Sequence, residues 1–158
     1  MVRERIPLMK SRASKVVSLT FPPQVVDGWP PFASECLPFV TLKSGYRLRT
    51  SPLFIKGLSR DDVISAEFDD DGHVSEWRHI RRSGHTTMWL MRLSLKNEIG
   101  RLLDLLKNAG CSLVDLGQYG CYAIDIPPKV PIYKIDQIVD LVNTDEVAVA
   151  FPSMRHEE

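Results

Sequence analysis

The chain has 158 residues, of which 44% are hydrophobic and 25% are charged. These proportions are typical of a globular protein with a real core, and they exclude a disordered chain, a collagen-like chain and a small disulfide scaffold. Because 20 Lys and Arg balance 20 Asp and Glu, the net charge is zero, which argues against a general nucleic-acid-binding protein. We therefore expect one domain, or two small lobes that share a core, and no nucleic-acid partner.

Residues 1–15 are predicted to form a flexible basic tail, because they carry five Lys or Arg against Glu4 alone. No apolar segment follows that would make this start a signal peptide. No stretch of the sequence approaches the roughly 18 apolar residues that cross a bilayer. The sequence therefore predicts no membrane association.

Residues 16–85 are predicted to form a β-rich lobe. Short runs with alternating apolar residues, separated by Pro and Gly turns, indicate strands at 16–21, 36–41, 46–49, 63–68 and 73–81. Asp69 to Gly72 is predicted to be a hairpin turn with the glycine at positive φ, and Ser59 to begin a helical turn as its cap. Many short strands with little helix indicate a small bent β-sheet or a partial barrel.

Residues 86–153 show a different periodicity. Strands are expected at 86–94, 111–116, 121–126 and 147–151, and helices at 98–108 and around 132–142. Asn97 is expected to cap the first helix and Gly110 to end it. This β-α-β-β-α-β order predicts a ferredoxin-like lobe, so that the whole chain is α+β. Residues 154–158 are expected to be a tail.

The three cysteines, Cys36, Cys111 and Cys121, have no zinc-binding spacing and are odd in number. Buried thiols in a reducing compartment are the simplest interpretation, which predicts a cytoplasmic protein. Cys111 and Cys121 are placed where they face each other on neighbouring strands.

An acidic run is the first candidate for a functional surface. The residues expected to contact a protein partner are Asp61, Asp62, Asp69, Asp70, Asp71, Glu76 and Trp77. Because three of these carboxylates are consecutive, they do not follow the alternate spacing of a calcium loop. The run is either a solvated hairpin tip or an acidic patch that meets a basic partner.

The histidines do not predict a metal site. His73 and His79 lie on one face of a strand but are separated by roughly 20 Å of extended chain. They cannot share one ion unless the strand bends sharply, and we expect neither a metal nor another cofactor.

Residues 82–87 (RSGHTT) form the second candidate site, with Arg82, Ser83, His85 and Thr87 as possible ligand contacts. A glycine turn flanked by hydroxyls and arginines suits an anion. His85 beside Ser83 also suggests a nucleophile and its base, although no third group or nucleophile elbow accompanies them. The alternative is a structural hinge between two β systems, with His85 bonded to the backbone.

Four segments together resemble a known family: residues 46–48 (YRL), 52–59 (PLFIKGLS) with 62–64 (DVI), 82–87 (RSGHTT) and 125–128 (DIPP). In this order they resemble an uncharacterised family of small bacterial proteins known only as a domain of unknown function. The resemblance spans residues 18–145 and implies a fold without implying an activity. The last 70 residues also resemble ferredoxin-like regulatory modules that bind small ligands, which implies ligand contacts at Asn97 and Arg101.

Three functions follow as alternatives. The first is a non-catalytic binding protein with a protein partner, for example an immunity protein that neutralises a toxin. The second is a small-molecule-sensing regulatory domain with its ligand near Asn97–Arg101. The third is an enzyme that uses His85. A homodimer formed through a sheet face or an edge strand is compatible with each of these functions.

Overall fold

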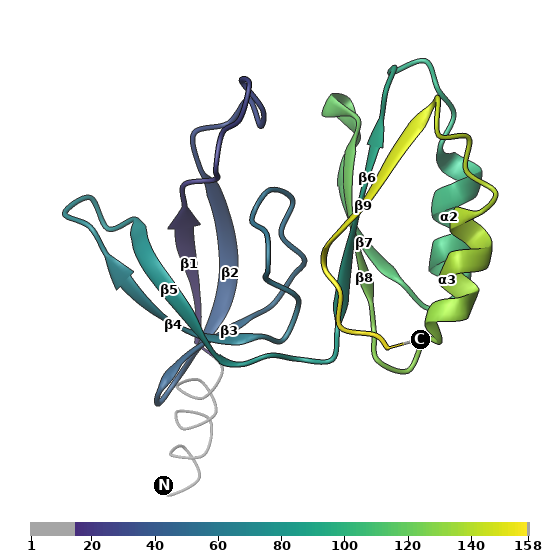
Figure 1. The fold of residues 1–158 in the computed structure, drawn as a ribbon. Coiled ribbons are helices and arrows are strands. Elements are labelled where there is room, and N and C mark those ends of the chain that lie inside the picture. The colour runs from purple at the N-terminus through teal and green to yellow at the C-terminus, as the bar shows by residue number, and fades with distance from the viewer. Residues whose placement is uncertain (1–14, 158) are drawn as a thin grey trace, which may run out of the picture. The chain divides into compact units, whose positions relative to one another are not determined.

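The computed structural model describes residues 15–157, which fold into two compact units (Figure 1). One unit contains the described chain up to Arg49 together with Asp61–Arg82, and the other contains Thr50–Arg60 and Ser83 onward. The described residues form nine strands in two antiparallel sheets, with two α-helices. The α+β class is thus confirmed. The expected basic tail, apart from Lys15, lies outside the described residues.

The N-terminal unit is a five-stranded meander whose strands pair in chain order. Its strands are β1 (Val16–Phe21), β2 (Glu35–Leu42), β3 (Gly45–Leu48), β4 (Val63–Phe68) and β5 (Val74–Arg81). Alternate positions of these strands carry the apolar side chains that form its core, because successive strand residues point to opposite faces. The rings of Phe21 and Phe39 stack there with centroids 5.9 Å apart, and both residues are buried.

The β4–β5 hairpin closes with the turn predicted from the sequence, and its closed end points away from the other strands of its sheet (Figure 1). Oδ1 of Asp69 accepts hydrogen bonds from the backbone N–H groups of Asp71 and His73, both at 2.9 Å. Gly72 has a φ of +81°, a value that glycine adopts without strain. Asp69 therefore has a structural role that the other carboxylates of the turn lack.

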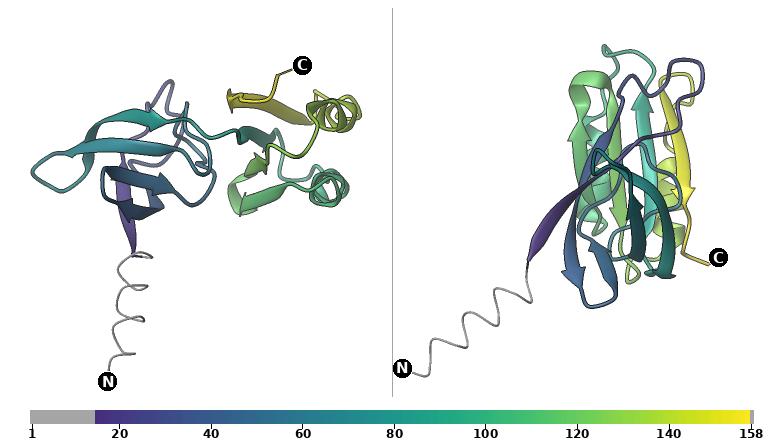
Figure 2. Two further views of the ribbon diagram at one scale, coloured as in Figure 1. Left: turned by 90° about the horizontal axis from the view of Figure 1, so that it is seen from below. Right: turned by 90° about the vertical axis from the view of Figure 1, so that its left-hand side faces the viewer.

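The C-terminal unit contains the strands and helices predicted from the change in periodicity. They are β6 (Thr86–Arg92), α2 (Gly100–Asn108), β7 (Ser112–Leu116), the 3-10 turn η2 (Gly117–Tyr119), β8 (Cys121–Ile126), α3 (Ile132–Val139) and β9 (Val147–Ser153). The strand order is β7-β8-β6-β9, and both helices cover one face of the sheet (Figure 2). The core between them is closed by side chains such as Met88, Leu106 and Ile124.

Two local expectations in this unit are wrong. The residue at the N-cap position of α2 is Ile99, and no side chain caps the helix. Asn97 instead donates its amide to the Glu146 backbone oxygen at 2.8 Å, because the chain runs past it for two more residues before the helix begins. Cys121 pairs with Leu116 at one end of β7, whereas Cys111 precedes the other end, so the two thiols do not face each other.

The segment Thr50–Arg60 was expected to belong to the β-rich lobe, but it packs with the C-terminal unit. Its residues form no strand, and Ser59 caps no helix. Ser59 is instead fully buried and bonded to side chains of β6 and β9. None of the helices in residues 15–157 combines the length and apolar character needed to cross a membrane.

Candidate functional site

Strand β6 presents alternate residues to the two faces of its sheet, and this alternation builds the candidate site. Met88 and Leu90 point into the core under the helices. Thr87 and Trp89 point to the opposite face, where they meet the segment Thr50–Arg60. The Trp89 indole N–H donates to the Pro52 backbone oxygen at 2.8 Å. The segment thus lies on the face of the sheet that carries no helix.

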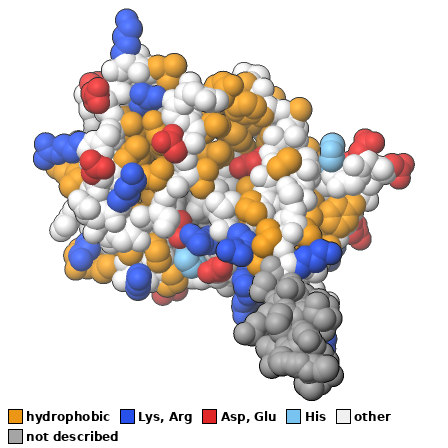
Figure 3. All heavy atoms as spheres, turned by 180° about the vertical axis from the view of Figure 1, so that it is seen from behind, with side chains coloured by type: hydrophobic (Ala, Val, Ile, Leu, Met, Phe, Trp, Pro, Cys, Tyr) orange, Lys and Arg blue, Asp and Glu red, His pale blue; other side chains and the backbone are white. Residues whose placement is uncertain are grey.

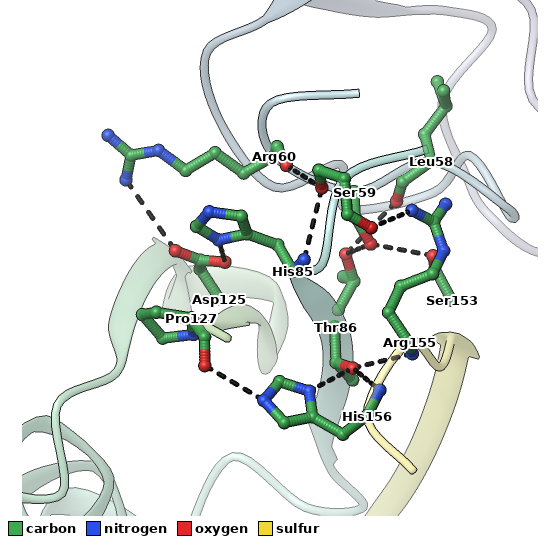
Figure 4. Close-up of polar contacts among 12 residues, drawn as sticks. Leu58, Ser59, Arg60, His85, Thr86, Asp125, Pro127, Ser153, Arg155 and His156 are labelled. Atoms are coloured by element: carbon green, nitrogen blue, oxygen red, sulfur yellow. Dashed lines mark hydrogen bonds and ion pairs between the residues drawn. The ribbon is translucent and has the colours of Figure 1, made fainter. Parts of the chain in front are cut away.

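Three buried hydroxyls join this segment to the sheet (Figure 4). Oγ of Ser59 lies 2.9 Å from Oγ1 of Thr87 and 2.7 Å from Oγ of Ser153. Thr87, only 1% exposed, also donates to the Leu58 backbone oxygen at 3.1 Å. These contacts satisfy polar groups that would otherwise be costly to bury.

His85 and Asp125 form the second part of the cluster. Nδ1 of His85 lies 2.7 Å from Oδ1 of Asp125, whose side chain is 5% exposed. The Arg60 guanidinium lies 3.9 Å from Oδ2 of the same carboxylate. Ser83 donates to the Arg60 backbone oxygen at 2.5 Å and accepts from the His85 N–H at 3.2 Å. The turn before β6 is therefore tied both to the segment and to β8.

Thr86 makes the equivalent connection on the helix-bearing face. Its Oγ1 accepts hydrogen bonds from the backbone N–H groups of Arg155, at 2.8 Å, and His156, at 3.1 Å. Nδ1 of His156 lies 2.7 Å from the same oxygen, and its Nε2 lies 3.0 Å from the Pro127 backbone oxygen. Two adjacent threonines thus anchor two different chain segments, one on each face.

The Arg155 side chain completes the network (Figure 4). Its guanidinium donates to the backbone oxygens of Ser83, at 2.9 Å, and Gly57, at 3.1 Å. Residues 154–158 were expected to be a tail. The described part of them, residues 154–157, contains three residues that are hydrogen-bonded into the unit: Met154, Arg155 and His156.

Beside Asp125 lies a hollow of about 50 Å³. It is lined by Thr50, Ser51, Arg60, Ser112, Leu113, Val114 and Asp125. Because a water molecule occupies about 30 Å³, the hollow has room for one or two waters and not for an organic substrate. Asp125 orients His85 as it would in a catalytic pair, but no substrate-sized space adjoins the pair at this hollow.

The structure brings three of the predicted ligand residues together, and the bonds described for this cluster include none of the other three. Ser83, His85 and Thr87 lie in the cluster described above. Arg82 is exposed and belongs to the N-terminal unit, and Arg101 is exposed on α2. The sequence identified neither Ser59 nor Asp125 as a site residue, although both lie in segments that carry the family resemblance.

The predicted acidic patch is smaller than expected. Asp62 is 0% exposed and lies 2.8 Å from Nε2 of His79, so it is not part of a surface. Asp61 is half-buried, with Oδ1 4.0 Å from Nε of Arg47. Trp77 is also half-buried, edge-on to the His79 ring at 5.2 Å. The carboxylates that remain exposed are those of the hairpin: Glu67, Asp69, Asp70, Asp71 and Glu76.

Two buried thiols have raised pKa values. Burial, and secondarily the negative charge of Asp125, raises the pKa of Cys111 to about 12. Burial also raises the pKa of Cys121. Because the thiolate is the reactive form, neither is suited to be a nucleophile. Within residues 15–157, no three His, Cys, Asp or Glu side chains gather closely enough to hold a metal ion.

The chain belongs to the family described as Domain of unknown function (DUF4265), whose model matches residues 39–150. The resemblance to an uncharacterised family is thereby confirmed. A crystal structure of a hypothetical protein from Neisseria gonorrhoeae shares the fold, with a TM-score of 0.70 and 17% identity over 89% of this chain and 98% of that one. No curated protein matches the sequence.

Proposed function

We propose that the protein is a non-catalytic binding protein, and that the closed end of its β4–β5 hairpin docks a basic protein partner. The observation that carries the proposal is the pairing of Glu67 with Glu76 directly across the two strands. Like charges in opposite positions destabilise an antiparallel ribbon. The pair is therefore less favourable than a pair of opposite charges, although Arg78 lies in the next cross-strand pair on the same face, and a Lys or Arg side chain of a partner adds a favourable contact.

The neighbouring turn adds to the same negative field. Asp70 and Asp71 are exposed, and acidic side chains gather at the projecting end of the hairpin (Figure 3). Phe68, 42% exposed, supplies an apolar contact beside them. Charges of one sign around an apolar side chain accelerate and orient association with a complementary surface.

The cluster around His85 supports the non-catalytic part of the proposal. Its hydroxyls and one oxygen of its carboxylate are hydrogen-bonded to other parts of the same chain, and the hollow beside Asp125 has room for only one or two waters. Groups used in this way hold segments together. An enzyme would present such a pair to a substrate-sized cavity, but the larger hollow of this unit, lined by Gly84, Arg155 and His156, is lined by neither His85 nor Asp125.

The test is an affinity capture with the full-length chain, comparing two charge-matched variants. In the hairpin variant, Asp70→Lys and Asp71→Lys reverse two negative charges at the closed end of the hairpin. Asp69 is retained because it stabilises the turn. In the control, Asp104→Lys and Asp145→Lys make the same charge change on exposed residues of the C-terminal unit. We expect a stoichiometric partner to be retained by the control and released by the hairpin variant, with association slowed at least about tenfold.

Equal capture by the two variants would refute docking at the hairpin. A captured partner with toxic activity that this protein suppresses would support the narrower proposal of an immunity protein. Glu67→Gln is the third variant, because it removes the cross-strand repulsion. It should raise stability while weakening the same partner.

A second candidate function, small-molecule sensing, is favoured by a larger hollow in the C-terminal unit. This hollow has a volume of about 860 Å³ and is lined by Gly84, residues 128–133, Asp136 and residues 155–157. It lies away from the Asn97–Arg101 connection expected to bind a ligand. If this function is correct, at least one compound in a screen of amino acids and nucleotides should raise the melting temperature of the protein, and Gly84→Leu should abolish that increase. No shift with any compound favours the protein partner.

We also propose the finer classification expected from the sequence. Support for a ferredoxin-like C-terminal unit is the element order β6-α2-β7-β8-α3-β9 with strand order β7-β8-β6-β9. Support for a partial barrel in the other unit is the contact between its first and last strands, β1 and β5. A cytoplasmic location is supported by Cys36, Cys111 and Cys121, all of which are free thiols.

A further inference from the structure

Ser51 presents a buried hydroxyl that the rest of the described chain does not satisfy. The residue is 4% exposed, and within residues 15–157 no donor or acceptor lies within hydrogen-bonding distance of its Oγ. Ser51 lines the hollow of about 50 Å³ beside Asp125. An unsatisfied buried hydroxyl is costly, so its position on a polar hollow indicates a bound hydrogen-bonding ligand.

The carboxylate that lines the same hollow can accept a further hydrogen bond. Oδ1 of Asp125 is bonded to His85 at 2.7 Å, but Oδ2 is 3.9 Å from the Arg60 guanidinium, which is too long for a hydrogen bond. Asp125 is itself 4% exposed. Thr50 and Ser112 add further hydroxyl-bearing residues to the lining.

The charges around the hollow determine what kind of ligand fits. A cation would be repelled by Arg60, and an anion would be repelled by Asp125. A neutral molecule that both donates and accepts satisfies all three groups: it accepts from Ser51 and Arg60 and donates to Asp125. The volume limits this molecule to the size of one or two waters.

We propose that an ordered water binds in this hollow, which is partly open to solvent, and bridges Ser51 Oγ to Asp125 Oδ2. The water connects the first residues of the segment Thr50–Arg60 to β8, and Asp125 connects β8 to His85 and Arg60. It is therefore a positioning ligand for the candidate site, and the inference does not depend on the proposed protein partner.

A crystal structure of the full-length protein at a resolution that shows ordered waters is the direct test. We expect a density peak about 2.7–3.2 Å from both Ser51 Oγ and Asp125 Oδ2. Two results would overturn the proposal. One is a dry hollow with the Ser51 hydroxyl bonded elsewhere, and the other is an ion with oxygen contacts of about 2.3–2.6 Å.

A solution measurement keeps the proposal testable without crystals. Oxygen-17 relaxation dispersion counts waters that stay bound for longer than the tumbling time of the protein. The matched variants are Ser51→Ala, which removes the bridge, and Ser112→Ala, which removes an exposed hydroxyl of the same lining. We expect Ser51→Ala to lose one long-lived water and Ser112→Ala to lose none. Equal counts in the wild-type protein and Ser51→Ala would contradict the bridge.

Discussion

Replacing Thr87 by valine removes one buried hydroxyl while nearly keeping the shape of the side chain. The hydroxyl contacts Ser59 Oγ at 2.9 Å and donates to the Leu58 backbone oxygen at 3.1 Å. Each neutral hydrogen bond contributes about 1 kcal/mol, and a buried carbonyl left without a donor costs about 1–3 kcal/mol. We therefore expect Thr87→Val to lower the free energy of unfolding of the C-terminal unit by about 2–3 kcal/mol.

Native-state hydrogen exchange measures this effect at the site where it acts. The Gly57 amide, which donates to the Pro152 backbone oxygen at 3.1 Å, reports whether the segment Thr50–Arg60 stays on the sheet. A loss of 2–3 kcal/mol corresponds to exchange faster by about 30- to 160-fold. Urea unfolding of the whole chain gives the accompanying change in free energy.

The control substitution is Thr20→Val, which removes a half-buried hydroxyl of the N-terminal unit whose partner is the weakly hydrogen-bonding Sγ of Cys36, at 3.3 Å. It should change stability by less than about 0.5 kcal/mol. A double-mutant cycle with Ser59→Ala should show coupling of about 1 kcal/mol. The reasoning fails if Thr87→Val behaves like the control and leaves the exchange of Gly57 unchanged.

Three further predictions concern two thiols and two glycines. In the native protein at pH 8, iodoacetamide should modify Cys36 first, because Cys36 is exposed whereas the Cys111 thiol is buried and stays protonated. Mass spectrometry of the modified peptides gives the order in which the thiols react. The pKa of Cys111 is about 12 in the folded protein and 9.0 in its reference state, so the unfolded chain loses the thiol proton at lower pH than the folded chain. The free energy of unfolding should therefore fall by up to about 1.4 kcal/mol per pH unit above pH 9. Urea unfolding measured across this pH range should show a smaller fall for Cys111→Ala. Gly45→Ala should destabilise the N-terminal unit by more than about 2 kcal/mol, because the added Cβ collides with a backbone oxygen of β4. In Gly72→Ala the added Cβ meets no neighbour, and the substitution should cost about 1 kcal/mol because the backbone φ is +81°. Thermal unfolding of the two variants measures the difference.

The strands and helices could be predicted from the sequence because the periodic spacing of apolar residues that determines them extends over only a few neighbouring residues. The alternate apolar residues Leu19 and Phe21 in β1 and the spacing of Leu103 and Leu106 in α2 indicate which face is buried. The Asp69–Gly72 turn was predictable for the same reason, since an aspartate that accepts nearby N–H groups and a glycine at positive φ act within a few residues.

The candidate site was only partly predictable, because its bonds join residues far apart in the sequence. Ser59 contacts Thr87 and Ser153, which lie 28 and 94 residues further along the chain. His85 contacts Asp125 across 40 residues. A local pattern for Ser59 suggests a helix cap, and nothing in the neighbouring residues indicates that the segment packs on the sheet that contains β6.

The residues that carry the family resemblance acquire a common explanation from these contacts. Segments 52–59, 82–87 and 125–128, which are separated in sequence, all meet around β6. Their hydroxyls and charges hold a loop without regular structure on a sheet, a task that needs specific polar partners because loop backbone cannot be buried without them. In this chain, the three segments are therefore explained by the requirements of one architecture. A binding function should be sought on exposed residues that do not stabilise the fold. The carboxylates of the β4–β5 hairpin are such residues, because Glu67 and Glu76 lie opposite each other and their like charges do not stabilise the hairpin.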